Sequence, residues 1–115
     1  MSEAEIISHE PATGAEIWRG PVSDIDDVVD RARRAWPAWA AQPLATRMEL
    51  VRRFANEMRK DAERLATTIA REVGKPLWES NAEVEATINK VEISIRAYAE
   101  RSAQRKHDNA MQGVT

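Results

Sequence analysis

The sequence of 115 residues contains no cysteine. A chain without cysteine cannot form disulfides, supply thiolate metal ligands or provide a cysteine nucleophile. Long apolar stretches are also missing, because a run such as Ala38–Ala41 is far too short to span a bilayer. The acidic segment Met1–Glu5 has neither the basic nor the apolar part of a signal peptide. We therefore expect a cytoplasmic protein that has no membrane partner.

Charge of one sign is not in large excess, since 17 lysines and arginines accompany 19 aspartates and glutamates. The net charge of −2 gives no general attraction to nucleic acid, and the arginines alternate with acids, so we expect no nucleic-acid partner. With 43% hydrophobic and 31% charged residues, the composition is typical of a globular protein of about one small domain.

Metal-binding patterns are weak in this sequence. His9 and His107 are far apart, and neither has a second ligand at helical spacing. One cluster of acidic residues lacks the central glycine and terminal glutamate of a calcium loop, and its position at a predicted helix start complements the helix dipole. The cluster consists of Asp24, Asp26, Asp27 and Asp30. We predict no metal site.

Strand patterns are confined to residues 3–20. The segments Glu5–Ser8 and Ala15–Trp18 contain branched or aromatic residues, and they flank Pro11–Gly14. A proline at the start and a glycine at the end of a four-residue connection suit a β-turn, so we predict a hairpin over 5–18. Two strands alone are marginally stable in water, and the hairpin therefore needs a surface to pack against.

Helical periodicity covers most of the remaining chain. Ser23 is the expected N-cap of the first helix, and Pro37 should end or kink it near Ala35 or Trp36. Gly74 should close the second helix in a left-handed conformation, and Pro76 prevents its continuation. The predicted helices span about 23–36, 44–73 and 78–101. Tryptophans on or beside their apolar stripes are expected to be core or interface anchors; these are Trp36, Trp39 and Trp78.

The third predicted helix has apolar residues on two faces. One stripe recurs at spacings of four, three, four and three, and consists of Val84, Ile88, Val91, Ile95 and Tyr98. The opposite face consists of Ala86, Ile93 and Ala97, with Lys90 among them. A helix with two apolar faces is expected inside a larger body. Glu92 is placed to pair with Arg96 along the same helix, and residues 102–115 read as a polar connector in which the chain stops.

Four segments together resemble the opening of an NAD(P)-dependent aldehyde dehydrogenase. They are Pro11–Gly14, Ala35–Trp39, Arg47–Phe54 and Glu72–Pro76. The Glu-x-Gly-Lys-Pro motif, followed by Glu83-Val84, is the most specific part. Within that superfamily, Gly74–Glu79 and Ile88–Tyr98 are most similar to the branch that acts on succinylglutamate semialdehyde in arginine catabolism. His9-Glu10 departs from the asparagine usual in the superfamily before this turn, which concerns only the turn.

The resemblance implies a mainly α fragment, an N-terminal β-hairpin plus three helices, that resembles the opening of the α/β Rossmann-like aldehyde dehydrogenase fold. Residues 1–101 would then be part of a nucleotide-binding domain. The family uses a cysteine nucleophile, a glutamate and a glycine-rich cofactor motif, none of which maps onto this chain. We therefore assign no catalytic and no cofactor-binding residue. The complete enzyme is expected to use NAD or NADP, whereas this chain alone is expected to bind neither and to be inactive.

The resemblance also suggests one site. The family's third helix lines the substrate tunnel, and the positions matching Ala86 and Lys90 face it. From the sequence alone, Lys90 either extends its charged end into solvent or meets an anion. The expected partner is the remainder of a dehydrogenase or a second copy of the chain. The alternative is an independently folding helical interaction module with no catalytic role.

Overall fold

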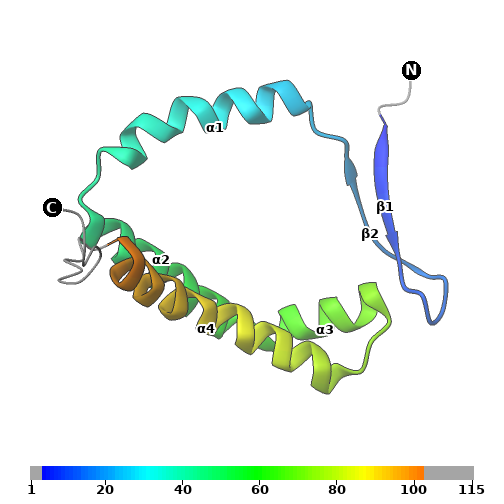
Figure 1. Ribbon diagram of the computed structural model, residues 1–115. Helices are drawn as coiled ribbons and strands as arrows, with labels where there is room; N and C mark the ends of the chain where they lie inside the picture. Colours follow the sequence, from blue (N-terminus) through cyan, green and yellow to red (C-terminus); the bar gives the residue numbers. More distant parts are fainter. Residues whose placement is uncertain (1–3, 103–115) are drawn as a thin grey trace, which may run out of the picture.

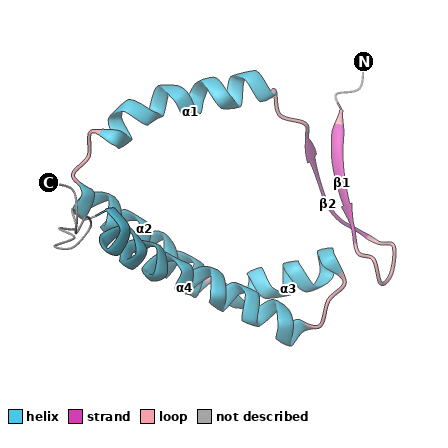
Figure 2. Ribbon diagram, viewed as in Figure 1, coloured by secondary structure: helices cyan, strands magenta, loops and turns pink. Residues whose placement is uncertain are grey.

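The structure is a computed structural model, and it describes residues 4–102. In this part of the chain, a two-stranded hairpin is followed by four helices (Figures 1 and 2). The hairpin and helix α1 (Ile25–Ala40) form one side of an open ring. Helices α2 (Leu44–Lys60), α3 (Ala62–Val73) and α4 (Leu77–Ser102) lie together on the other side.

The hairpin confirms the strand prediction and is longer than expected. Strand β1 (Glu5–His9) pairs antiparallel with β2 (Glu16–Pro21), which continues three residues beyond the predicted end at Trp18. In the turn, the Glu10 backbone N–H donates to the carbonyl of Ala15 at 2.8 Å, and that of Gly14 donates to the carbonyl of Glu10 at 2.7 Å. Gly14 has φ 74°, which a glycine adopts without steric cost.

Helix α1 differs from the prediction at both ends. Asp24, not Ser23, is its N-cap, because the Asp24 carboxylate accepts hydrogen bonds from the backbone of Asp26 and Asp27 at 2.9 and 3.2 Å. Of the two expectations for Pro37, an end of the helix near Ala35 or Trp36 was wrong, since the helix continues through Pro37 to Ala40; a kink there stays a prediction. Proline removes one backbone donor, to the carbonyl of Arg33, and on this exposed helix water can bind that carbonyl instead.

The single helix predicted over 44–73 is two helices. Asp61 separates α2 from α3 with φ −107° and ψ 14°, outside the helical region. Its backbone N–H is shared between the carbonyls of Glu57 and Met58 at 3.3 and 3.2 Å, a tightened last turn. The Asp61 carboxylate accepts hydrogen bonds from Arg64, one turn into α3. The apolar period runs across this break without interruption, so hydrophobic periodicity could not predict it.

The predicted end of the second helical segment and the start of the third are confirmed. Gly74 has φ 75°, and its N–H donates to the carbonyl of Ala70 at 2.9 Å. Pro76 then opens α4, because its carbonyl accepts from the backbone N–H of Glu79 and Ser80 at 3.1 and 3.2 Å. The Gly-Lys-Pro segment therefore reverses the chain and sets α4 against α3 and α2.

The core is small and lies where α2, α3 and α4 meet. Its buried apolar residues, among those described, are Ala55, Ala66, Val84 and Ile88. The first half of the predicted stripe on α4 is therefore buried, whereas Tyr98 at its end is 49% exposed. On the opposite face of α4, Ile93 is 44% exposed, so this second apolar face has no partner among the described residues.

The molecule is open. Its radius of gyration is 21.2 Å, and a compact domain of this length has about 13 Å. Its accessible surface is 9823 Å², whereas a compact protein of this size exposes about 6,300 Å². Helix α1 has no buried residue, and Trp36 and Trp78 are 66% and 72% exposed. The expectation that these tryptophans form a core within the chain was wrong; an interface role remains open to them.

Membrane insertion through helices finds no support in this structure, because none of the helices in residues 4–102 is both long and apolar enough to cross a bilayer.

Candidate functional site

Ala86 and Lys90 lie together on an open groove. The groove has a volume of about 420 Å³, and it runs between α4 and Val51 of α2. The remaining lining residues are Thr87, Val91 and Ser94. Both candidate residues are exposed, one turn apart on the same side of α4. The structure therefore brings the two residues to one surface, on the flank of the second apolar face.

Lys90 is the one cation on this groove. Its ammonium forms no ion pair with any of residues 4–102, in contrast to Lys60 and Lys75, which pair with Glu57 and Glu83. The groove offers mainly apolar surface around it, from Val51, Ala86 and Val91. Such a site can hold an extended molecule whose body is apolar and whose end carries a negative charge.

A second, more apolar pocket adjoins this groove. The two share Val51, Val91 and Ser94 in their linings. The second pocket, of about 200 Å³, is formed where the end of α1 meets α2 and α4. Its other lining residues are Trp39, Leu44, Arg47, Met48, Ile95 and Tyr98. At this corner, Trp39 of α1 therefore faces residues of α2 and α4.

Two ion pairs fix the orientation of α4. Arg52 of α2 donates from Nε to Glu92 Oε1 at 2.6 Å and from Nη2 to Oε2 at 3.1 Å, a two-point contact. The hydrogen bond from Arg52 lowers the pKa of Glu92. Glu92 thus forms its ion pair with Arg52 on another helix. The prediction that Glu92 pairs with Arg96 was wrong. At the other end of α4, Lys75 pairs with Glu83, and this contact raises the pKa of Lys75.

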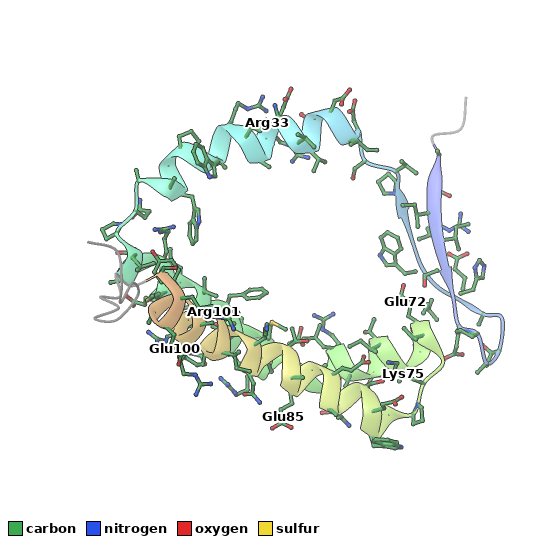
Figure 3. All side chains as sticks on the ribbon, viewed as in Figure 1. Arg33, Glu72, Lys75, Glu85, Glu100 and Arg101 are labelled. Atoms are coloured by element: carbon green, nitrogen blue, oxygen red, sulfur yellow. The ribbon has the colours of Figure 1, made fainter. Side chains whose placement is uncertain are left out.

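The hairpin is held at the far end of α3 by polar contacts. Ser8 Oγ donates to Glu72 Oε1 at 2.8 Å, and Figure 3 shows Glu72 on the part of α3 next to the strands. Arg71 Nε donates to Glu10 Oε1 at 2.9 Å. The pKa of Glu10 is lowered, first by the hydrogen bond from Thr13 and then by that from Arg71. Glu10 therefore contacts both Thr13 within the turn and Arg71 on α3.

The other candidates from the sequence have structural explanations. Asp24 caps α1, and Asp27 pairs with Arg31 at 3.0 Å. No group of three or more potential metal ligands occurs in the part of the chain that the structure describes. His9 lies on β1, and His107 is outside the described residues.

The described residues do not fit a dinucleotide. A pyrophosphate site needs glycines at the start of a helix, so that backbone N–H groups can approach the phosphates. Here Gly74 ends a helix, Gly14 lies in the hairpin turn, and Gly20 lies in β2 against the Trp18 ring. With no cysteine in the sequence, an acyl-enzyme cannot form on this chain either.

Sequence reasoning missed the part played by Arg47. Its Nε atom is buried and has no hydrogen-bond partner among the described residues. A signal was present, since an arginine interrupts the apolar residues at the start of the second helical segment. Periodicity alone could not distinguish it from the many exposed arginines of the same helix.

Comparison with known proteins identifies the family. The model of the aldehyde dehydrogenase family matches residues 1–114. The chain is 74% identical over 114 residues to N-succinylglutamate 5-semialdehyde dehydrogenase of Novosphingobium aromaticivorans, which covers 99% of this chain and 24% of that protein. It is 56% identical over 111 residues to the enzyme of the same name from Sphingopyxis alaskensis, covering 96% and 23%. The chain spans about a quarter of the length of these relatives, and it belongs to the aldehyde dehydrogenase family.

Proposed function

We propose that the chain is the amino-terminal portion of an N-succinylglutamate 5-semialdehyde dehydrogenase of the cytoplasm, in which it forms one wall of the substrate tunnel. The high identity to relatives of that name supports the assignment. The open shape supports the role of a portion, because a chain with so small a core needs a larger body to cover it. The same openness argues against the alternative of an independently folding helical module.

The catalytic groups belong to the remainder of the enzyme in this proposal. NAD or NADP would accept the hydride there, and we assign no coenzyme contact to residues 4–102. The contribution of this chain is the scaffold and the groove that carries Ala86 and Lys90. The substrate named by the relatives is an aldehyde that also carries carboxylates, and a carboxylate is the group that an unpaired ammonium binds.

The observation that carries the substrate role is the position of Lys90, exposed on a largely apolar groove and without an ion pair among the described residues. A small side chain at Ala86, one turn before it, leaves room for the substrate. Lys90 would hold a carboxylate at one end of the substrate and so orient the aldehyde at the other. Holding substrate in both ground and transition state lowers KM and leaves kcat nearly unchanged.

The test uses a chimeric enzyme, in which residues 1–114 of this chain replace the matching segment of the Novosphingobium relative. We expect Lys90→Ala to raise KM for N-succinylglutamate 5-semialdehyde by about 10-fold to 100-fold, the usual effect of losing a hydrogen bond to a charged group. The KM for an uncharged aliphatic aldehyde should stay the same, and Lys90→Arg should retain most of the affinity. The control is Lys60→Ala, which removes a lysine already paired with Glu57. An unchanged KM for the charged substrate in Lys90→Ala would end the proposed role.

A further inference from the structure

Two hydrogen-bond donors on the groove beside Lys90 are not used by the chain itself. Polar side chains line the groove at Thr87, Lys90 and Ser94. The Thr87 hydroxyl donates to the backbone carbonyl of Glu83 at 2.8 Å. Within residues 4–102, Lys90 forms no ion pair and Ser94 Oγ forms no hydrogen bond. The groove therefore offers a ligand one ammonium and one hydroxyl.

These two donors are one helical turn apart on α4. Ala86, Lys90 and Ser94 follow one another at a spacing of four residues, so they line one side of the helix over about 12 Å. One such spacing corresponds to about 6 Å along the axis. A long side chain in a helix leans toward the N-terminus, so the ammonium of Lys90 is expected to lie farther than this from the Ser94 hydroxyl. The pair therefore suits two acceptor groups about 7 Å apart, and not two that are about 4 Å apart.

The groove carries no negative charge of its own. None of its lining residues in the described part of the chain is acidic. The positions three and four residues from Lys90 on either side, which are its neighbours on the helix surface, are also uncharged. They are Ala86, Thr87, Ile93 and Ser94. A ligand with two negative groups therefore meets one cation here and no repulsion.

The substrate named by the relatives carries two carboxylates at a matching distance. N-succinylglutamate 5-semialdehyde has one carboxylate at the end of its succinyl group and another on the glutamate Cα. Three bonds of an extended chain span about 3.8 Å, so these two carboxyl carbons, which are six bonds apart, are separated by about 7 Å. The succinyl amide carbonyl is only three bonds from the first carboxylate, about 4 Å. The second carboxylate is therefore the acceptor that matches the groove.

We infer that the Ser94 hydroxyl donates a hydrogen bond to the α-carboxylate of N-succinylglutamate 5-semialdehyde, while Lys90 holds the succinyl carboxylate. The inference rests on the proposed function, which supplies the substrate and the remainder of the enzyme. The glutamate Cα is a branch point, so a carboxylate held at Ser94 leaves the aldehyde arm free to extend out of the groove toward the catalytic groups. Ser94 is thereby a specificity-determining residue, because it distinguishes substrates that have the second carboxylate from those that lack it.

Steady-state kinetics of the chimeric enzyme with two substrates test the inference. The second substrate is N-succinyl-4-aminobutanal, which keeps the succinyl carboxylate, the amide and the aldehyde but lacks the α-carboxylate. Ser94→Ala should raise KM for the full substrate by about 10-fold with little change in kcat, as expected when a hydrogen bond to a charged group is lost. The KM for the analogue should stay the same. An equal change for both substrates, or no change for the full one, would overturn the inference.

Three further variants separate this inference from the proposed function. Ser94→Thr keeps the hydroxyl and should retain most of the affinity. Lys90→Ala should raise KM for both substrates, since both carry the succinyl carboxylate. Thr67→Ala removes an exposed hydroxyl on α3, outside the groove, and should leave both KM values unchanged. If Lys90→Ala raises both values and Ser94→Ala raises them equally, the inference alone fails. A chimeric enzyme that oxidises neither substrate contradicts the proposed function as well.

A crystal structure of the chimeric enzyme with the product, N-succinylglutamate, gives a readout besides activity. We expect an oxygen of the α-carboxylate within about 3.0 Å of Ser94 Oγ, and an oxygen of the succinyl carboxylate within about 3.2 Å of Lys90 Nζ. A product that contacts Lys90 but places its α-carboxylate away from Ser94 would overturn the inference alone. A product bound outside the groove would overturn both the inference and the proposed role of Lys90.

Discussion

Arg71 Nε donates to Glu10 Oε1 at 2.9 Å, and this contact joins residues that are 61 positions apart in the sequence. It places the end of α3 on the turn of the hairpin, where Ser8 and Glu72 make a second contact at 2.8 Å. The hairpin has no apolar sheet partner in the described structure, so these polar contacts and the packing of Pro11 near Gly74 position it. The attachment of the hairpin should therefore depend on the charges of Glu10 and Arg71 and on the absence of a side chain at Gly74.

The first prediction concerns pH. The pKa of Glu10 is lowered in the folded state, so its contribution to docking is present above the ordinary glutamate pKa of about 4.3 and is lost as pH falls through the lowered value. We expect the hairpin to loosen only below about pH 4.3, as followed by amide chemical shifts of the turn. Because the Arg71 side chain is 53% exposed, although that of Glu10 is only 18% exposed, the change in docking equilibrium should be less than about fivefold.

The control for this titration is Glu10→Gln, which keeps the shape of the side chain and removes its charge. The acid transition of the turn should disappear in this variant. Glu49→Gln, on α2 away from the hairpin, should leave it in place. A turn that titrates identically in Glu10→Gln would show that another group is responsible.

The second prediction separates backbone strain from packing at two glycines. Gly14 and Gly74 have nearly the same φ, 74° and 75°. A Cβ at Gly14 would meet no atom within 4 Å, whereas at Gly74 it would lie 3.3 Å from Pro11 Cβ. Gly14→Ala should therefore cost about 1–2 kcal/mol of unfolding free energy for the left-handed conformation alone. Gly74→Ala should cost more, because the hairpin must also shift. Urea unfolding of the chimeric enzyme measures both, and equal losses would argue against the Pro11 contact.

The third prediction concerns the small core. Ile88 is 6% exposed between α2, α3 and α4, and its replacement by alanine should destabilise the chimeric enzyme by roughly 2–4 kcal/mol in urea unfolding. The matched control is Ile93→Ala on the same helix, whose side chain contacts mostly solvent. If the second face of α4 is open to solvent in the chimeric enzyme, this second change should have little effect on its stability. A comparable loss at Ile93 would mean that the second face of α4 is covered in solution.

The sequence was sufficient where local chemistry decides the structure. Gly74 and Pro76 determined the end of α3 and the start of α4, and Pro11 with Gly14 determined the turn. The sequence was insufficient where a local preference has only a small effect on the free energy. Pro37 was expected to end or kink α1 and does not end it, because an exposed helix loses only one solvated hydrogen bond there. Asp61 breaks the long helix through its own backbone and its contact with Arg64, and hydrophobic periodicity does not report either.

The candidate site was predictable only in part, and for a physical reason. Helical spacing placed Ala86 and Lys90 on one side of α4, which the structure confirms. Which helix would lie beside them depends on contacts between distant residues, such as Arg52 with Glu92. The same holds for Arg47, whose lack of a partner becomes visible only when the surrounding helices are in place.

The last prediction concerns the exposed face of α1. Trp36 is 66% exposed, and its helix buries no residue within the described chain. Figure 3 shows Arg33 on the outer side of α1, whereas Trp39 lines the pocket formed with α2 and α4. Large aromatic side chains in this arrangement are typical of a surface that another body covers.

In a variant that keeps Trp36 and replaces the other tryptophans by phenylalanine, acrylamide should quench the fluorescence of Trp36 efficiently in the chain alone. Quenching should fall several-fold in the chimeric enzyme and recover when both are unfolded in urea. Equal quenching in the two folded proteins would show that the face of α1 stays open to solvent in the enzyme.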